Sequence, residues 1–452
     1  MNADANIAEF VASLEWSEVP ADVARKAQDH VIDALGVICA GLAAPASPMV
    51  RGYMSELGGA PEASVIGCAT ALPAPNAAFV NAFHGRIHTF DDTYEAGPVH
   101  AGTVVLAAVL AAAERTHASG TDLLAGLLAG HEVSVRVASA LGPGHYGSGF
   151  HCTGTSNAIG AAAGVARVLR LGAAGVAGAL GHAGGGASGL RQFIESGSMT
   201  DSALNGARAA QTGVTAALLT ARGLPGPTVI LTGRFGVLSV LATDADPSRL
   251  DAGLGKDWMY RETGLKPFPT CRFTHGPIAE VLELRRRHQL DPVSVEAVYV
   301  DACHQSVVTS DRPKVETRFD ALMGHQFGIA AALANGRVGM ESLEPAVIGD
   351  AMVRELTPRV HVRHEADFDA AYPARWRHRI RIVLKDGREL DADSPHPPGD
   401  AAAPLDAEVL LGKYRDLAVP VLGNAGAERL RAAASSLETL QDVAELGPLL
   451  RG

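Results

Sequence analysis

The chain has 452 residues, of which 47% are hydrophobic and 19% charged, and it carries a formal net charge of −11 at pH 7. This composition is typical of a soluble globular protein, and the length predicts two domains rather than a single core. The negative charge argues against nucleic acid and against an anionic membrane as partners. It leaves a small anionic substrate open, because a local pocket can be positive on an acidic protein.

The cysteines and the N-terminus indicate a cytoplasmic protein. Five cysteines are scattered along the chain, and no Cys-x-x-Cys pair occurs, so we interpret them as reduced thiols. The first residues contain no basic segment followed by an apolar one, so we expect no signal peptide. No uninterrupted apolar run reaches about 20 residues, and we therefore expect no membrane span.

Apolar residues recur at helical spacing through most of the first 222 residues. The predicted helices cover residues 7–17, 21–43, 74–88, 100–117, 121–141, 152–170, 173–180 and 201–222. The glycine-rich stretch 181–190 lacks the Gly-Lys-Ser/Thr ending of a phosphate loop. We expect it either to allow close helix approach or to form a turn whose N–H groups face an anion.

The pattern changes near residue 265, where a basic, proline-bracketed segment begins. After it, helices are predicted over 277–288 and near 321–335, and strands over 295–302, 359–362 and 377–384. Asp386-Gly387 is typical of a hairpin turn. We therefore expect a mainly α protein, in which a large helical domain (1–264, completed by 398–452) is interrupted by a smaller α+β lid (265–397).

The stretch 84–102 is the strongest candidate for a functional site. It contains three histidines, three carboxylates, an arginine and a tyrosine between two bland apolar segments. Both flanking segments are predicted helices, and Gly97-Pro98 forces a loop between them. A titratable loop held between two buried helices is where a binding or catalytic site is expected.

Two alternatives arise from the spacing within this loop. His84 and His88 are four residues apart on a predicted helix, and two aspartates follow, which could form a metal site. We favour histidines that hydrogen-bond to loop carbonyls, and we predict no metal. Asp91 and Asp92 point in different directions on any regular backbone. At most one should face a substrate, while the other caps a helix or pairs with Arg86.

Other residues add acid–base and cationic groups. His100 and His151 both lie at loop-to-helix junctions, where an imidazole can act as a general acid or base. Lys266, Arg272 and His275 form a basic cluster that could bind carboxylates, and the alternative is a solvated basic loop. Arg191 is a further candidate for carboxylate binding.

These groups indicate one class of chemistry. The sequence contains neither a Gly-x-Ser-x-Gly nucleophile motif nor a phosphate-binding loop, and no cofactor is evident. Histidine, aspartate, lysine and tyrosine beside cations suit proton abstraction next to a carboxylate, followed by elimination, decarboxylation or epimerisation.

A series of short motifs runs in order through nearly the whole chain. Its members are residues 78–81, 90–93 with His100 downstream, 150–155, 187–190, 195–200, 208–213, 266–269, 404–405 and 413–414. This ordered series resembles the MmgE/PrpD superfamily, which includes 2-methylcitrate dehydratases, cis-aconitate decarboxylases and iminodisuccinate epimerases.

The resemblance implies an interrupted helical domain with an α+β lid, a homodimer, a site between the domains and cofactor-independent chemistry on di- or tricarboxylates. Carried over by position, the implied site residues are Thr93, His100, His151 and Lys266, with Asp91 and Asp92 beside them. We assign catalysis to His100, His151, Asp91 and Lys266. The predicted substrate-binding residues are Thr93, Arg86, His88, Asp92, Arg272 and His275.

Two positions depart from the family's pattern. Dehydratases and decarboxylases of the family usually have an aspartate two positions before the Asp-Asp pair, where this chain has Thr89. They also have Lys-x-x-His after the Gly-Ser-Met-Thr stretch, where this chain has Asp201-Ser202-Ala203-Leu204-Asn205. His88 or Asp91 could replace the missing carboxylate, and Arg272 or His275 the missing cation.

Three functional hypotheses follow. The first is a cofactor-independent lyase that acts on a di- or tricarboxylate, as a 2-methylcitrate dehydratase or a cis-aconitate decarboxylase does. The second is an epimerase or isomerase of an iminodisuccinate-like dicarboxylate, which stays close to the first because the two departures count against a true 2-methylcitrate dehydratase. The third is a non-catalytic homologue that only binds its ligand.

Overall fold

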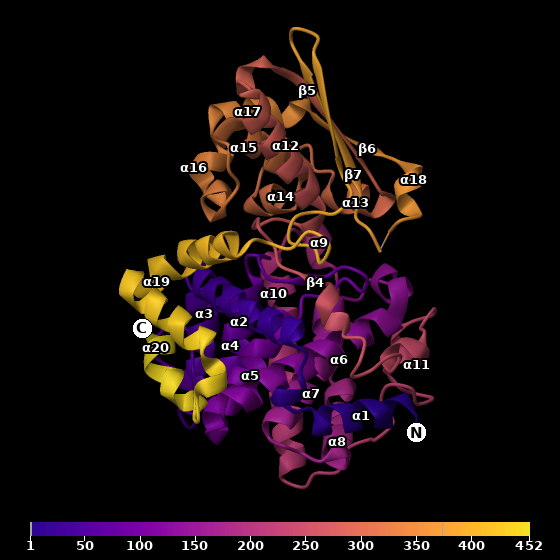
Figure 1. Ribbon diagram of the computed structural model, residues 1–452, viewed down its shortest axis with the longest axis vertical. Coiled ribbons are helices and arrows are strands. Elements are labelled where there is room, and N and C mark those ends of the chain that lie inside the picture. Colours follow the sequence, from indigo (N-terminus) through magenta and orange to yellow (C-terminus); the bar gives the residue numbers. More distant parts are fainter. Residues whose placement is uncertain (1, 373) are drawn as a thin grey trace. The chain divides into compact units, whose positions relative to one another are not determined.

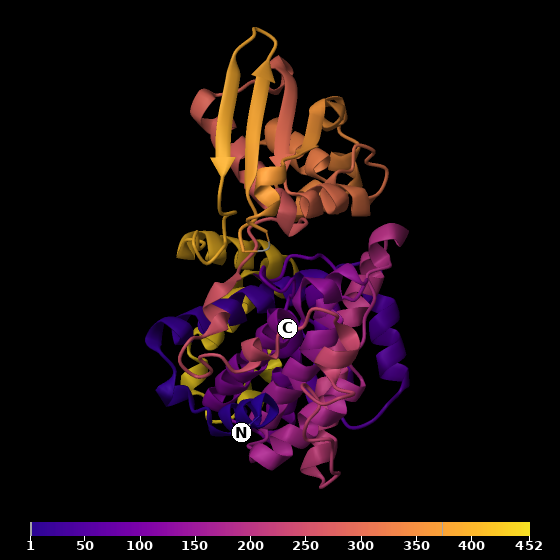
Figure 2. The ribbon, with the colours of Figure 1, turned by 90° about the vertical axis from the view of Figure 1, so that its right-hand side faces the viewer.

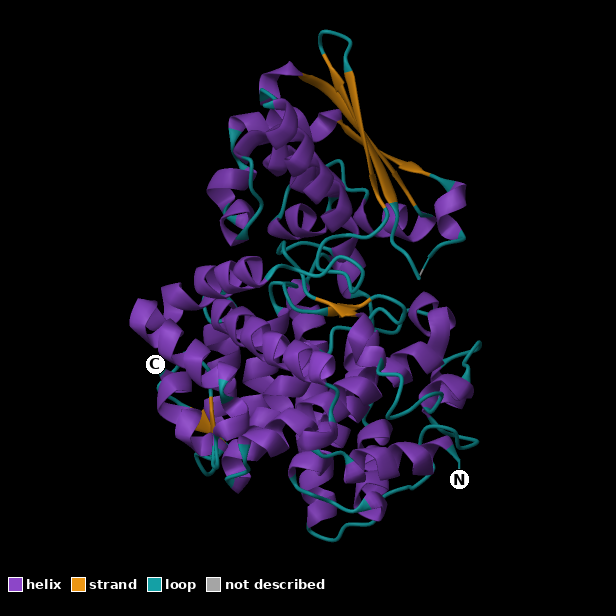
Figure 3. Ribbon diagram, in the orientation of Figure 1, coloured by secondary structure: helices purple, strands orange, loops and turns teal. Residues whose placement is uncertain are grey.

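The computed structural model describes residues 2–372 and 374–452, and Figure 1 labels its elements. Contacts divide the chain into two compact units, which we treat separately. The first unit comprises Met1–Phe193, Met199–Thr263 and Ala407–Gly452, and the second comprises Ile194–Ser198 and Gly264–Asp406. Helices dominate the structure, as Figure 3 shows, so the prediction of a mainly α protein is confirmed.

The first unit is built almost entirely from helices. They are α1 (Ala3–Ser13), α2 (Ala21–Gly41), α3 (Ser47–Glu56), α4 (Ala74–Arg86), α5 (Gly102–Thr116), α6 (Gly120–Gly147), α7 (Cys152–Val168), α8 (Ala173–Gly185), α10 (Met199–Ala221), α11 (Val237–Leu241), α19 (Ala407–Ser435) and α20 (Gly447–Arg451). Short strands also occur, namely β1 (Ala63–Ser64), β2 (Ala71–Leu72) and β3 (Thr93–Tyr94). The expectation that this part of the chain is entirely helical is therefore wrong. The elements α9 (Phe193–Ser196) and β4 (Thr263–Gly264) lie where the chain passes between units.

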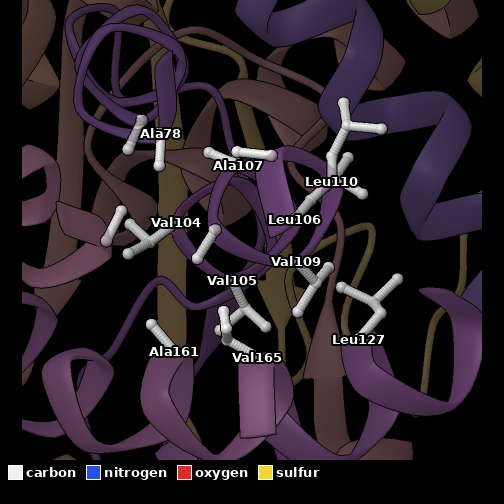
Figure 4. Packing of buried hydrophobic residues seen from close by; sticks show 14 of the residues in the cluster. Ala78, Val104, Val105, Leu106, Ala107, Val109, Leu110, Leu127, Ala161 and Val165 are labelled. Atoms are coloured by element: carbon white, nitrogen blue, oxygen red, sulfur yellow. The ribbon is translucent and has the colours of Figure 1, made fainter. Parts of the chain in front are cut away.

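Helix α5 is the centre of the first unit's core. Every residue from Gly102 to Glu114 is buried, because this helix is apolar on all sides and packs against α4, α6, α7 and α10. Figure 4 shows side chains of α5 and of the helices that pack around it. Those labelled are Ala78 of α4, Val104, Val105, Leu106, Ala107, Val109 and Leu110 of α5, Leu127 of α6, and Ala161 and Val165 of α7.

Glycines allow α6 and α7 to approach closely. A Cβ added to Gly164 would lie 2.6 Å from the carbonyl oxygen of Gly126, and one added to Gly130 would lie 2.7 Å from that of Gly160. The glycine-rich stretch 181–190 behaves similarly, since a Cβ on Gly181 would lie 2.0 Å from the carbonyl oxygen of Pro227. The glycine thus allows close approach of α8 to the loop that contains Pro227, and not to another helix.

The sequence-based element boundaries differ from the structure at several places. Helix α3, with the sequence Ser-Pro-Met-Val-Arg-Gly-Tyr-Met-Ser-Glu, was not predicted, and Ser47 and Met54 are its only buried residues. Residues 142–149 were expected to be a loop, but α6 resumes after a break at Gly142, whose φ is +69°. Only glycine adopts this left-handed conformation without strain.

The second unit contains a four-stranded sheet with helices on one face (Figure 2). The strands β5 (Val295–Ala302), β6 (Val360–His364), β7 (His378–Leu384) and β8 (Glu389–Ser394) lie in the order β6-β5-β7-β8. Only the β5–β6 pair is parallel. The helices are α12 (His275–His288), α13 (His304–Ser310), α14 (Arg318–Met323), α15 (His325–Asn335), α16 (Pro345–Ile348), α17 (Ala351–Leu356) and α18 (Ala366–Asp369).

The predicted strands and hairpin of this unit are confirmed. The turn between β7 and β8 contains Gly387 at φ +87°, as an Asp-Gly hairpin requires. The helix predicted near 321–335 is instead two helices, because Gly324 between them is extended. Among the described residues, no helix combines the length and the apolar character that a membrane crossing needs.

The close contact at Gly164 yields a test of the core. We expect Gly164→Ala to lower the free energy of unfolding by about 1–3 kcal/mol, because the added methyl meets backbone atoms that cannot move aside. Gly412→Ala in α19 is the control, since nothing lies within 4 Å of its added Cβ. It should be neutral or stabilise by up to about 1 kcal/mol. Urea unfolding measures both, and equal effects would contradict this packing.

Candidate active site

The loop between α4 and α5 is held by a buried ion pair. Arg86, the last residue of α4, pairs through Nη1 with the Oδ1 atom of Asp91, and the two side chains are 1% and 0% exposed. The other oxygen of Asp91 accepts a hydrogen bond of 3.2 Å from the hydroxyl of Thr103 in α5. Asp91 therefore ties the loop to the ends of both helices.

Asp92 binds the N-terminus of α5. Its Oδ1 accepts a hydrogen bond of 2.7 Å from the backbone N–H of Gly102, and its Oδ2 accepts one of 3.3 Å from that of Ala101. A carboxylate suits this end of a helix, where unpaired N–H groups concentrate positive charge. A Cβ on Gly102 would lie 2.6 Å from Oδ1 of Asp92, so the glycine is required for this contact.

The surroundings of Asp92 make it hard to ionise. Burial, followed by the negative charge of Asp91, raises the pKa of Asp92 to about 7, although the hydrogen bond from Gly102 opposes the shift. Its Oδ2 also lies 3.6 Å from Nε2 of His131. Burial lowers the pKa of His131 to about 3, so this histidine is neutral and does not supply a counter-charge.

His100 is oriented by the same loop. Its Nδ1 lies 2.7 Å from the backbone oxygen of Asp92 and 3.1 Å from the hydroxyl of Thr93. A carbonyl oxygen only accepts hydrogen bonds, so Nδ1 must carry the proton. In the neutral imidazole the lone pair is then on Nε2, which is the basic nitrogen.

His151 precedes α7 and is held in the other tautomer. Asn205 of α10 donates from Nδ2 to the carbonyl oxygen of Leu190, at 3.1 Å, which fixes the orientation of its amide. The same Nδ2 lies 3.1 Å from Nδ1 of His151, so Nδ1 accepts and Nε2 carries the proton. Burial, aided by the positive charge of Arg86, lowers the pKa of His151 well below its usual value.

The two junction histidines are therefore chemically complementary. In its neutral form His100 presents a basic Nε2, and neutral His151 presents an Nε2–H donor. Hydrogen bonds also link the backbone of His100 to the helix that follows His151. The N–H of His100 donates to the hydroxyl of Thr153 at 3.3 Å, and Nδ2 of Asn157 donates to the carbonyl oxygen of His100 at 2.6 Å. Both partners belong to α7, which follows His151 directly.

The remaining histidines of the loop contact the scaffold. The Nε2 of His88 lies 3.2 Å from the carbonyl oxygen of Ala40, and the Nε2 of His84 lies 2.8 Å from the hydroxyl of Ser47. Thr89 is buried and has φ +50°, a strained conformation for a β-branched residue.

Sequence reasoning missed the contact of Asn205 with His151 and that of Lys413 with the α4–α5 loop. Lys413 of α19 pairs with Asp33 of α2 at 2.6 Å, and its Nζ donates to the carbonyl oxygen of Phe90 at 2.8 Å. It also lies 4.1 Å from the centre of the Phe90 ring. Position within the motifs 413–414 was the only signal for Lys413, and nothing in the sequence alone pairs Asn205 with His151.

The predicted basic residues of the second unit are buried, so the alternative of a solvated basic loop is wrong. Lys266, Arg272 and His275 are 1%, 3% and 0% exposed. Arg272 donates to the carbonyl oxygen of Pro398 at 2.7 Å, and the Nε2 of His275 lies 3.1 Å from that of Thr270. These contacts tie η4 (Arg272–Thr274) and the residue after it to the segments that contain Pro398 and Thr270.

Arg191 of the first unit lies against Tyr146. Its guanidinium is 3.4 Å from the ring centre and donates to the backbone oxygen of the same residue at 2.8 Å. Within residues 2–372 and 374–452, no three His, Cys, Asp or Glu side chains are grouped as a metal ion would require.

The comparisons with known proteins define the class of this chain. The MmgE/PrpD N-terminal domain matches residues 5–250, and the MmgE/PrpD C-terminal domain matches residues 268–439. The chain therefore belongs to the MmgE/PrpD family, as the motifs predicted.

Proteins named as cis-aconitate decarboxylases or as similar to them match this chain over nearly its full length. The cis-aconitate decarboxylase-like protein oryM of Aspergillus oryzae is 26% identical, over 100% of this chain and 98% of the relative. The cis-aconitate decarboxylase of Aspergillus terreus is 26% identical over 99% and 95%. That of Mus musculus is 26% identical over 99% and 93%.

The raised pKa of Asp92 predicts a pH-dependent stability. Between pH 4 and 7 the folded protein holds a proton on Asp92 that the unfolded chain has released, so stability falls as the pH rises through this window. The loss is at most about 1.4 kcal/mol per pH unit. We expect the wild-type stability, relative to Asp92→Asn, to decline up to about pH 7 and then level off.

Urea unfolding at successive pH values measures this difference. Asp416→Asn is the control, because Asp416 is exposed on α19 and should leave the pH dependence of the wild type unchanged. A constant difference between the wild type and Asp92→Asn across pH 4–8 would show that Asp92 is ionised normally.

Proposed function

We propose that this protein is a cofactor-independent lyase that acts on a di- or tricarboxylate, in the manner of a cis-aconitate decarboxylase or a 2-methylcitrate dehydratase. The observation that supports this most is the complementary pair of tautomers at His100 and His151. Family membership and the names of the relatives support the lyase class.

The pair supplies the two proton transfers of an elimination. The Nε2 of His100 would remove a proton from the carbon next to a carboxylate, and the leaving hydroxyl would take the proton from Nε2 of His151 and depart as water. The electron pair of the broken C–H bond becomes the new double bond. His100 is then an imidazolium and His151 has given up its Nε2 proton, so a proton passes from the first ring to the second through water and restores both for the next turnover.

A decarboxylation needs only one of these transfers. The bond to a carboxylate breaks, CO₂ leaves, and the electron pair stays on a carbon skeleton that the remaining carboxylates delocalise. The Nε2–H of His151 would protonate that carbon and regain its proton from water. We further propose that Lys266 binds a substrate carboxylate, because a buried ammonium is a strong partner for one.

The sequence assigned Asp91 to catalysis and Asp92 to substrate binding, and the contacts of both residues favour a positioning role instead. Asp91 is paired with Arg86 and Asp92 accepts two backbone N–H groups, so we propose that both act by positioning His100 and α5. Thr93 would act with them, through its contact with His100. The pairing with Asp91 also occupies Arg86, which the sequence had suggested as a carboxylate ligand.

An epimerase of an iminodisuccinate-like dicarboxylate is the second candidate. The specific observation in its favour is that one base and one acid are held in opposite tautomers, which is what removal and return of a proton at one carbon requires.

A homodimer and a cytoplasmic location also remain predictions from the sequence.

Proton NMR in D₂O with cis-aconitate, 2-methylcitrate and iminodisuccinate tests the proposal. New vinyl signals or loss of a carboxylate would establish a lyase, and deuterium at an α-carbon without elimination would establish the epimerase. We expect His100→Ala and His151→Ala each to lower kcat by about 10²–10⁴-fold. His288→Ala is the control, because His288 is exposed at the end of α12.

Two outcomes would contradict the proposal. Turnover that survives both histidine substitutions would exclude them as acid and base. Binding of these carboxylates without any turnover by the wild type would indicate the non-catalytic homologue.

A further inference from the structure

A surface cavity of the first unit lies between α3 and the β1–β2 hairpin, and none of its lining residues belongs to the loop 84–102. Its volume is about 220 Å³. Arg51, Ser55 and Thr70 form its polar side. Pro48, Val65 and Leu72 form its apolar side.

Arg51 brings a charge to this cavity that the protein does not neutralise. Its Nε donates to the hydroxyl of Ser47 at 3.3 Å, and its Nη1 donates to the sulfur of Cys68 at 3.4 Å. Burial raises the pKa of the Cys68 thiol, so both acceptors are uncharged at neutral pH. Within the described part of the chain, no carboxylate pairs with Arg51. A half-buried guanidinium with only neutral partners favours an anion.

The cavity is connected to the candidate site through two buried side chains. The hydroxyl that accepts from Arg51 belongs to Ser47, and the same atom lies 2.8 Å from Nε2 of His84. Both Ser47 and His84 are 0% exposed. His84 lies in the last turn of α4, two residues before the Arg86 that holds the loop.

We propose that this cavity is a second binding site, which takes a small carboxylate with a short apolar chain. The carboxylate would contact Arg51, Ser55 and Thr70, and the apolar chain would lie against Val65 and Leu72. Occupation draws Arg51 toward the ligand and weakens its bond to Ser47, so that the environment of His84 changes when the cavity is filled. The ligand therefore binds away from His100 and His151, and its binding does not depend on catalytic turnover.

Ligand-observed NMR with butyrate, and with acetate as the shorter probe, tests the site. We expect butyrate to bind the wild type more tightly than acetate does. Arg51→Gln should weaken butyrate binding at least about ten-fold, because a charge-assisted hydrogen bond is lost. Arg222→Gln is the matched control, since Arg222 is exposed after α10 and should leave the affinity unchanged. Thermal unfolding of both variants verifies that they are folded.

The connection to His84 is tested with histidine-labelled protein. Butyrate should shift the His84 imidazole signal, which is assigned as the one that His84→Gln lacks. Ser47→Ala should retain binding and lose that shift. Equal affinity of the wild type and Arg51→Gln, or of butyrate and acetate, would overturn the proposal. Because these experiments measure binding, their failure would leave the proposed lyase activity untouched, and the reverse also holds.

Discussion

Two adjacent carboxylates are buried between the ends of two helices, and the arrangement of the loop follows from the need to stabilise them. A buried carboxylate is costly unless it is paired, hydrogen-bonded or protonated. Asp91 is paired with Arg86, while Asp92 accepts N–H groups at the start of α5 and holds its proton up to about pH 7. Both solutions require glycine nearby, since a side chain on Gly102 would displace Asp92 and one on Gly206 would meet Arg86 at 2.9 Å. The chain between the two helices is therefore fixed at its start and at its end.

The same constraint orients the acid–base groups. Because Asp92 is anchored, its backbone oxygen is available to accept a hydrogen bond from the Nδ1–H group of His100. His151 is set independently by Asn205, whose amide is itself fixed by the carbonyl of Leu190. The resulting tautomers are opposite, which gives one acceptor and one donor. Burial keeps His151 neutral, so proton transfer depends on the direction of its hydrogen bonds rather than on its charge.

Apolar periodicity predicted the main helices and the strands β5, β6 and β7 of the second unit, but not β8, because burial of one face is recorded in the local pattern of residues. It failed at α3, whose apolar Met49 and Tyr53 are exposed and not buried, and at Gly324, where one predicted helix is two. Local sequence also identified the loop 84–102, since its titratable residues are adjacent. The contacts of Asn205 and Lys413 were not predictable, because tertiary packing brings them from distant helices to His151 and Phe90. The strain at Thr89 was equally hidden, since a backbone angle is not encoded by one residue type.

The central claim is that His100 and His151 hold their protons on different nitrogens. Long-range ¹H–¹⁵N NMR of histidine-labelled protein at neutral pH measures this directly, and His100→Gln and His151→Gln assign the two rings by the signals that disappear. The structure predicts a proton on Nδ1 of neutral His100 and on Nε2 of neutral His151. A proton on Nε2 of His100 in its neutral form, or on Nδ1 of His151, would contradict the claim and remove the physical basis of the proposed acid–base pair.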